Sequence, residues 1–126
     1  SLFVAGFIGS PKMNFLDGYL ENNNVNANEI NFPYRKENYK GDVIIGIRPE
    51  HMYISKNGLI NFNVDLVEQL GSDNLVYGEI NGKKDFCYRS SGNDLIRSGD
   101  KMSLNILENK FFLFDKNNGE RLRLSN

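Results

Sequence analysis

Few side chains in this 126-residue sequence could perform catalytic or metal-binding chemistry. The chain has one histidine, His51, and one cysteine, Cys87, which could form a base–nucleophile pair if they met in the fold. A lone cysteine in a strand is more often a small buried hydrophobic residue, so we favour the structural interpretation of Cys87. One cysteine excludes an internal disulfide and a zinc cluster, and one histidine lacks partners at metal-ligand spacing. We therefore predict neither a catalytic residue nor a metal site.

A charged string from Gly46 to His51, Gly-Ile-Arg-Pro-Glu-His, is the most informative local pattern. It follows an apolar segment that predicts a buried strand. Pro49 fixes its own φ and biases Arg48 toward extended backbone. The functional interpretation is a conformation-sensitive contact with a partner. The structural interpretation is that Arg48 and Glu50 hold neighbouring loops through charge-assisted hydrogen bonds, and the residues alone favour it.

Composition and absent motifs exclude several classes of protein. Lys and Arg total 15 and Asp and Glu total 16, which argues against a general nucleic-acid binder and a polybasic membrane-surface protein. The sequence contains no Gly-x-x-x-x-Gly-Lys-Ser loop, no Gly-x-Gly-x-x-Gly and no Gly-x-Ser-x-Gly, so these nucleotide and hydrolase motifs are absent. No apolar run reaches the roughly 18 residues that span a bilayer.

Two weaker patterns leave binding functions open. Lys83-Lys84, Arg121 and Arg123 lie near aromatic residues and could form an oligonucleotide platform on a small barrel, although acidic neighbours weaken the local field. Backbone amides near Gly71-Ser72 or Ser90-Ser91-Gly92 could form an anion nest, although such clusters are usually plain turns.

The elements that must position these residues are strands. Tight-turn dipeptides separate the apolar segments, at Asp17-Gly18, Asn57-Gly58, Asn81-Gly82 and Asn118-Gly119. Apolar residues alternate with polar ones from Ile60 to Leu66 and from Met102 to Ile106, and a break at Leu66-Val67 predicts a bulge. Leu75 to Phe86 is typical of a hairpin. We predict an all-β meander or barrel.

Other segments depart from simple alternation. Val43–Ile47 and Phe111–Phe114 are apolar on both faces, which predicts cover on both sides, one of them by a subunit contact. The polar stretches Glu21–Asn31 and Tyr34–Asp42 are predicted to be long, mobile loops. Ser90–Asp100 is predicted to be a loop with one helical turn at Leu95-Ile96.

The start of the chain differs from the rest. Residues 2–8 are mostly apolar and end at Gly9-Ser10-Pro11, which predicts a short helix. The apolar start without an initiator Met predicts a piece of a longer protein. We expect residues 1–10 to be the tail and linker of a preceding domain and residues 11–126 to form one domain.

Four strings together resemble a known family, and they occur in that family's order from one end of the chain to the other. They are Phe3–Pro11 with Met13-Asn14, Gly46–His51, Val67–Ser72, and Phe112–Asp115 continuing through Gly119–Leu122. The chain resembles the C-terminal region of ATP-binding subunits of ABC sugar importers, which serve maltose, related oligosaccharides and glycerol 3-phosphate.

The resemblance implies an OB-like β-barrel, called a TOBE domain, with a short helical segment left from the nucleotide-binding domain. It implies a regulatory and dimerising role on the cytoplasmic side, peripheral to the inner membrane. The implied partners are a second copy of the subunit, permease subunits through the missing domain, and a regulatory protein or metabolite, with no nucleic acid and no direct membrane insertion. This segment would have no cofactor and no enzyme activity, while the parent would use ATP and Mg²⁺.

Combining the resemblance with the local patterns gives candidate partner or regulatory contacts. They are Arg48, Pro49, Glu50, His51, Gly71, Ser72, Phe112 and Phe114. Two alternatives remain: a stand-alone OB-fold module that binds single-stranded nucleic acid, and a small oxyanion-binding barrel.

Overall fold

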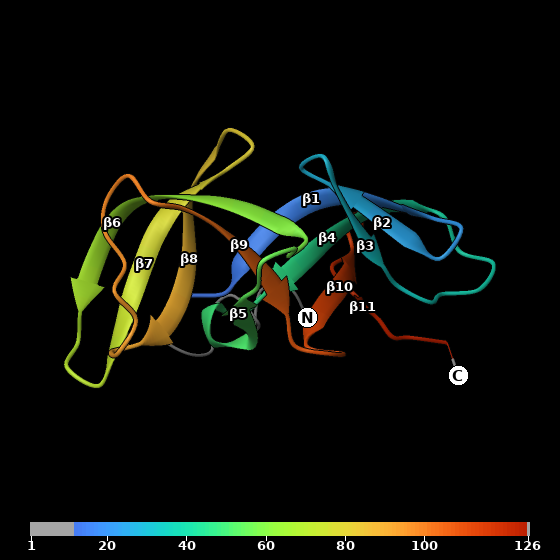
Figure 1. Ribbon diagram of the computed structural model, residues 1–126. Helices are drawn as coiled ribbons and strands as arrows, with labels where there is room; N and C mark the ends of the chain where they lie inside the picture. The colour runs from blue at the N-terminus through green and yellow to red at the C-terminus, as the bar shows by residue number, and fades with distance from the viewer. Residues whose placement is uncertain (1–11, 126) are drawn as a thin grey trace.

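The computed structural model describes residues 12–125 and consists mainly of β-strands (Figure 1). Its strands are β1 (Asn14–Glu21), β2 (Asn24–Ala27), β3 (Ile30–Pro33), β4 (Gly41–Ile47), β5 (Met52–Ile54), β6 (Ile60–Gln69), β7 (Asp73–Ile80), β8 (Lys83–Ser91), β9 (Lys101–Ile106), β10 (Phe111–Asp115) and β11 (Arg121–Leu122). Within these residues the sole helical element is a 3₁₀ turn, η1 (Pro49–His51). The predicted all-β class is confirmed.

The strands form two sheets that lie side by side (Figure 1). The order is β11-β10-β4-β1-β2-β3 in the six-stranded sheet and β5-β9-β6-β7-β8 in the five-stranded sheet. The chain passes between the sheets twice, through η1 after β4 and again after β9. The two passages are adjacent, because the Leu107 N–H donates to the His51 carbonyl oxygen at 2.8 Å.

The five-stranded sheet curls as an OB-like barrel requires. Its two edge strands, β5 and β8, contact each other, and the Tyr88 phenol on β8 is hydrogen-bonded to the backbone of Ile54 on β5. A bulge between Val64 and Leu66 on β6 increases the local twist, one residue before its predicted position. The OB-like fold is therefore confirmed, whereas the helix predicted over residues 1–10 lies outside the described residues.

The core is formed by the inward faces of both sheets. On β6 the predicted alternation holds from Ile60 to Val64, because Ile60, Phe62 and Val64 are buried while Asn61 and Asn63 are exposed. It fails at Leu66, which follows the bulge and is 59% exposed. One cluster of buried side chains includes residues from both sheets, so the sheets share a hydrophobic core. Its largest fully buried members include Phe32, Phe62, Phe86, Leu16, Leu20, Ile45, Ile47, Ile60, Ile80, Leu104 and Leu113.

The tight turns are made where the chain adopts positive φ. Asn81-Gly82 joins β7 to β8 with φ values of 45° and 86°, as predicted for a two-residue hairpin. Asn118-Gly119 lies in the turn between β10 and β11, also as predicted. The prediction for Asp17-Gly18 is wrong, because both residues lie inside β1 and pair with β4.

The Asn-rich segment is the largest correction. Glu21–Asn31, predicted to be a loop, contains β2 and the start of β3, joined by two-residue turns at Asn22-Asn23 and Asn28-Glu29. All four turn residues have φ between 51° and 64°. Three of the four are asparagines, which tolerate this left-handed region better than most residues and stand where a turn pattern normally contains glycine; the fourth is Glu29.

Two further predictions are wrong. Ser90–Asp100 contains the end of β8 followed by turns and bends, with no helical turn at Leu95-Ile96. Asn57-Gly58 lies at a turn but does not join paired strands, because β5 and β6 both pair with β9.

Candidate functional site

Four of the predicted contact residues, Arg48 to His51, form the first passage between the sheets. Arg48 follows β4 with extended backbone, φ −75° and ψ 139°, as the following proline requires. Pro49 is buried as the first residue of η1, and η1 packs against β8 of the other sheet. The charged string therefore connects the two sheets rather than lying in a free loop.

Phe112 is the centre of a cationic cluster on the outward face of the six-stranded sheet. The guanidinium carbon of Arg121 lies 4.6 Å from its ring centroid, and that of Arg48 lies 5.9 Å from the same centroid. Both distances are within the range of a cation–π interaction. Phe112 on β10 pairs with Gly46 on β4. Arg121 on β11 pairs with Phe114, which lies two residues after Phe112 on the same face of β10.

Gly46 leaves space for this cluster of rings. A Cβ atom built on Gly46 would lie 2.5 Å from Met13 Sδ, 3.3 Å from Phe15 Cε1 and 3.4 Å from Phe114 Cε2. Glycine at this position lets aromatic side chains from β1 and β10 pack over the backbone of β4. The predicted contact residue Phe114 is consequently 3% exposed, although it belongs to the outward side.

The acidic end of the string is directed toward the five-stranded sheet. Glu50 is exposed and contributes to the electrostatic environment of Arg89 and Cys87 on β8. Arg89 forms an ion pair with Asp73 on β7, and that hydrogen bond is the main cause of its raised pKa. Arg48 therefore contacts Phe112 of the six-stranded sheet, whereas Glu50 interacts electrostatically with residues of the five-stranded sheet.

Cys87 is buried on β8, and His51 ends η1. Burial raises the pKa of Cys87 to about 11, so the thiol is protonated at neutral pH and is a weak nucleophile. The Nδ1 atom of His51 is buried, with no hydrogen-bond partner among the described residues. Cys87 fits the structural interpretation that its sequence context favours.

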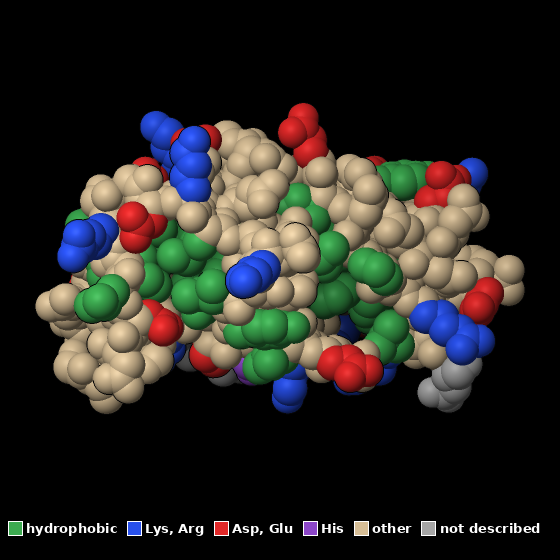
Figure 2. All heavy atoms as spheres, viewed as in Figure 1, with side chains coloured by type: hydrophobic (Ala, Val, Ile, Leu, Met, Phe, Trp, Pro, Cys, Tyr) green, Lys and Arg blue, Asp and Glu red, His purple; other side chains and the backbone are tan. Residues whose placement is uncertain are grey.

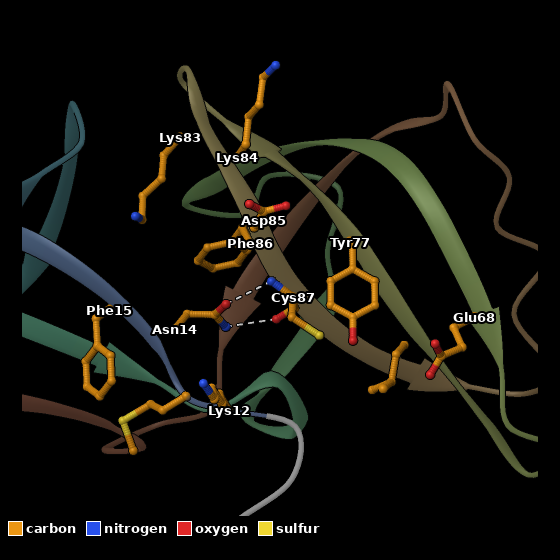
Figure 3. Close-up of a pocket in the computed structure, with 12 residues that line it drawn as sticks. Lys12, Asn14, Phe15, Glu68, Tyr77, Lys83, Lys84, Asp85, Phe86 and Cys87 are labelled. Carbon is orange, nitrogen blue, oxygen red and sulfur yellow. Dashed lines mark hydrogen bonds between the residues drawn. The ribbon is translucent and has the colours of Figure 1, made fainter. Parts of the chain in front are cut away.

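Asn14, which the sequence did not single out, links the two sheets (Figure 3). Its amide nitrogen donates to the carbonyl oxygens of Ile47 at 3.0 Å and Cys87 at 2.8 Å. Its Oδ1 atom accepts the Cys87 N–H at 2.8 Å. The side chain therefore bonds the edge of β8 as another strand would. The available signal was a polar residue in phase with the inward-facing Leu16 and Leu20.

A cavity of about 670 Å³ opens beside Asn14 between β1 and the β7–β8 hairpin. Lys83 points toward β1 within it, whereas Lys84 extends away (Figure 3). Arg121 and Arg123, the other half of the postulated oligonucleotide platform, belong to the six-stranded sheet and the segment after it. The basic pairs thus lie on different sheets.

The surface charge is mixed on the face that Figure 2 shows. Basic and acidic side chains are interspersed around a hydrophobic centre, with no continuous basic stripe on that face (Figure 2). In residues 12–125, no group of three or more His, Cys, Asp or Glu side chains could hold a metal ion. No helix in that part of the chain is long and apolar enough to cross a membrane.

Gly71 and Ser72 lie away from this site, at the exposed β6–β7 turn (Figure 1). They contact the turn after β8, where the Gly92 N–H donates to the Ser72 carbonyl oxygen at 3.0 Å. The amides of Asn93 and Asp94 likewise donate to Ser91. Several amides that could have formed an anion nest therefore already have partners.

Two family models match the sequence in overlapping segments. The model described as MalK OB fold domain matches residues 9–52, and the model described as TOBE domain matches residues 45–114. The two matches meet at the passage that holds Arg48 and η1.

Curated relatives match nearly the whole chain. A protein of Ruegeria sp. (strain TM1040), named sn-glycerol-3-phosphate import ATP-binding protein UgpC, is 37% identical over 123 residues, covering 97% of this chain and 35% of the relative. Proteins of the same name are 36% identical over 132 positions in Escherichia coli (strain K12) and 33% identical over 133 positions in Psychromonas ingrahamii, covering 97% and 98% of this chain and 36% of each relative. The chain spans about a third of the length of these relatives.

Proposed function

The chain belongs to the TOBE domain family, and we propose that it is the C-terminal regulatory and dimerising region of an ABC importer's ATP-binding subunit. The imported compound would be a carbohydrate or glycerol 3-phosphate. The observation that carries the proposal is the nearly complete match of this chain to relatives named as import ATP-binding proteins.

The proposal assigns ATP and Mg²⁺ to another domain of the parent subunit. The sequence contains no phosphate-cradling glycine loop, and burial keeps its one thiol protonated, so the role proposed for these residues is binding rather than catalysis. The parent would lie on the cytoplasmic side of the membrane, and its other domain would contact the permease subunits.

The dimerising role is supported by the outward face around β4 and β10. Ile44 and Phe112 on this face are only partly buried within one chain, and a second copy would cover them further. Symmetric association of identical chains commonly uses such a self-complementary apolar patch. Arg48, Glu50 and His51 would then transmit strain between the two sheets when the partner binds.

A chimera tests the proposal. Residues 12–126 replace the matching third of the Escherichia coli relative, and uptake of sn-glycerol 3-phosphate is compared with that of the relative truncated before this region. We expect the chimera to take up the substrate and to dimerise more strongly than the truncated protein in sedimentation velocity. A folded chimera that does neither contradicts the proposal, as does ATP turnover by the isolated chain.

A further inference from the structure

The cavity beside Asn14 lies between the two sheets and is lined by lysines from both sides. Lys12, directly before β1, and Lys83, at the start of β8, line it, and Lys83 points toward β1 (Figure 3). None of the ion pairs in residues 12–125 includes either lysine. The cavity volume of about 670 Å³ is typical of a small-molecule site. Two ammonium groups without an ion-pair partner among these residues are therefore available to a ligand.

The floor of this cavity is apolar and fixed in place. Met13, Leu75 and Phe86 line it and are buried. The amide nitrogen and the Oδ1 atom of Asn14 are hydrogen-bonded to backbone groups of both sheets, so this side chain positions the wall and does not bind the ligand itself. A wall that is already ordered lowers the entropy cost of binding.

The opposite end of the cavity is acidic. Glu68 on β6 lies beyond Tyr77 from the two lysines (Figure 3). The Tyr77 hydroxyl is hydrogen-bonded to the Cys87 thiol, and desolvation by burial raises the pKa of Tyr77, so this hydroxyl stays protonated at neutral pH. A carboxylate accepts hydrogen bonds and does not donate them. A matching ligand therefore carries hydrogen-bond donors at the end away from its negative charge.

The charges at the two ends select a chemical class. An ammonium group binds phosphate as a point charge, and two ammonium groups match a dianion better than they match a single carboxylate. A phosphate monoester carries a charge of about −1.5 to −2 at neutral pH. Hydroxyl groups on its organic part would donate to Glu68, whereas the carboxylates of Glu68 and Asp85 repel a polyanion such as nucleic acid. A small polyol phosphate satisfies both ends.

The hairpin end that carries Lys83 has an unusual backbone. The β7–β8 register shifts between Gly78 and Ile80, and Asp85 on β8 has a φ of 63°, in the left-handed region. Bulges of this kind commonly redirect side chains beside binding sites. Lys83 points toward β1, while the next residue, Lys84, extends away from the cavity (Figure 3). The two lysines are therefore a matched pair that an experiment can separate.

We propose that this cavity binds a phosphate monoester of a small polyol or sugar, with the phosphate held by Lys12 and Lys83 and the hydroxyl groups at the Glu68 end. The inference rests on the regulatory role proposed above, because it names the class of metabolite that this region would sense. The ligand would bridge β1 and the β7–β8 hairpin and so hold the two sheets together. Lys83 and Tyr77 belong to the five-stranded sheet, so the site does not use the Ile44–Phe112 face assigned to a second copy.

The test is a titration of the ¹⁵N-labelled chain with sn-glycerol 3-phosphate and with glucose 6-phosphate. Binding is followed in nuclear magnetic resonance spectra through the Cys87 backbone amide and the Asn14 side-chain amide, which lie at the cavity wall. Glycerol and inorganic phosphate are the control ligands, because each contains only one half of the proposed class. We expect both amides to shift with at least one phosphate monoester, no shift with glycerol, and binding of inorganic phosphate that is weaker by about tenfold or more.

Two neighbouring lysines supply the matched variants. Lys83→Gln removes an ammonium group directed toward the cavity and should weaken binding of the phosphate monoester about tenfold. Lys84→Gln removes the same charge from a side chain that extends away, and should change the affinity by less than about twofold. Both side chains are exposed, so neither change removes a core contact.

Each other outcome overturns the proposal. If neither phosphate monoester shifts the two amides, the cavity is not a site for this class of metabolite. If inorganic phosphate binds with the same affinity, the cavity binds small anions without reading the polyol. If both lysine variants weaken binding equally, the attraction comes from the general charge of the hairpin. The wild-type titration needs no variant to fold, and a working chimera combined with a failed titration would reject this site while retaining the proposed function.

Discussion

Strands β6 and β4 both present alternate side chains to the core, but their outward faces differ. On β6, Phe62 is fully buried while its neighbours Asn61 and Asn63 are exposed and polar. On β4, Ile45 is fully buried, and the outward-facing Gly46 is buried as well, under rings from β1 and β10. The same period of two therefore produces a water-facing surface in one sheet and an apolar, arginine-bearing surface in the other.

The difference supports the contact role that we propose for the outward face of the six-stranded sheet. A polar outward face needs only water, so the exposed side of β6 requires no further partner. An outward face that combines aromatic rings with two arginines on one ring exposes apolar area to water, which is unfavourable. Such a face is typical of a contact surface. The four predictions below test this contrast, beginning with the largest expected effect.

Replacing the core ring of β6 should have the largest effect on stability. Phe62 is fully buried and packs edge-on against Phe86, with ring centroids 5.9 Å apart. Phe62→Ala should lower the free energy of unfolding by about 3–5 kcal/mol, because it removes apolar burial and leaves a cavity. Asn61→Ala on the opposite face should change it by less than about 0.5 kcal/mol. Urea unfolding measures both, and comparable losses would contradict the one-sided burial of β6.

Removing the Asn14 side chain, which links the two sheets, should have the second largest effect on stability. Asn14→Ala removes three buried hydrogen bonds and leaves backbone groups of Cys87 and Ile47 without those partners. We expect a loss of about 2–3 kcal/mol, since each buried unsatisfied group is costly. Asn26→Ala is the matched control, because its amide bonds Asn31 on the exposed surface. If the two variants unfold at the same urea concentration, Asn14 does not hold the sheets together.

How much the sequence could predict depended on whether the signal was local. The alternation from Ile60 to Val64 on β6 and the turn at Asn81-Gly82 were correctly predicted, because period and turn type are set by neighbouring residues. The β1–β3 region was missed because its turns, Asn22-Asn23 and Asn28-Glu29, contain no glycine, while Asp17-Gly18 resembles a turn but lies in a paired strand. Glycine is needed at position 18 because Ala27 pairs with it, and a Cβ atom on residue 18 would lie 3.0 Å from the Ala27 Cβ atom.

Only part of the candidate site could be predicted from the sequence, because its residues are brought together by long-range strand pairing. Arg48 and Phe112 could be selected from their strings, but their meeting depends on β4 pairing with β10, across more than sixty residues. Arg121 was noted only as a basic residue, since nothing local places it on Phe112. Asn14 is hydrogen-bonded to the backbone of Cys87, which is 73 residues away in the sequence. Contacts at such separations follow from topology, and one sequence without relatives does not define them.

A methyl group on β4 should test the outward face directly. Gly46→Ala places a Cβ atom 2.5 Å from Met13 Sδ, and the flexible methionine must move away. We expect a loss of about 1–2 kcal/mol in unfolding free energy, the usual cost of overpacking. The double variant Met13→Ala/Gly46→Ala should lose less than the sum of the single variants, because the clash is gone. Additive losses would mean that Met13 does not cover Gly46.

The smallest expected effect concerns the turn between β10 and β11, which precedes Arg121. The pKa of Asp115 is lowered, mainly because Asp115 accepts a hydrogen bond from the Tyr39 hydroxyl at 2.7 Å and further from the Asn117 N–H. A carboxyl whose pKa is lower in the folded state stabilises the fold above its unfolded pKa, about 3.9, and this stabilisation is lost as pH falls through the folded value. Tyr39→Phe should therefore reduce the loss of thermal stability between neutral pH and pH 2. An unchanged acid response in Tyr39→Phe would show that the bond does not hold this turn, and the arginine face would then depend on β-pairing alone.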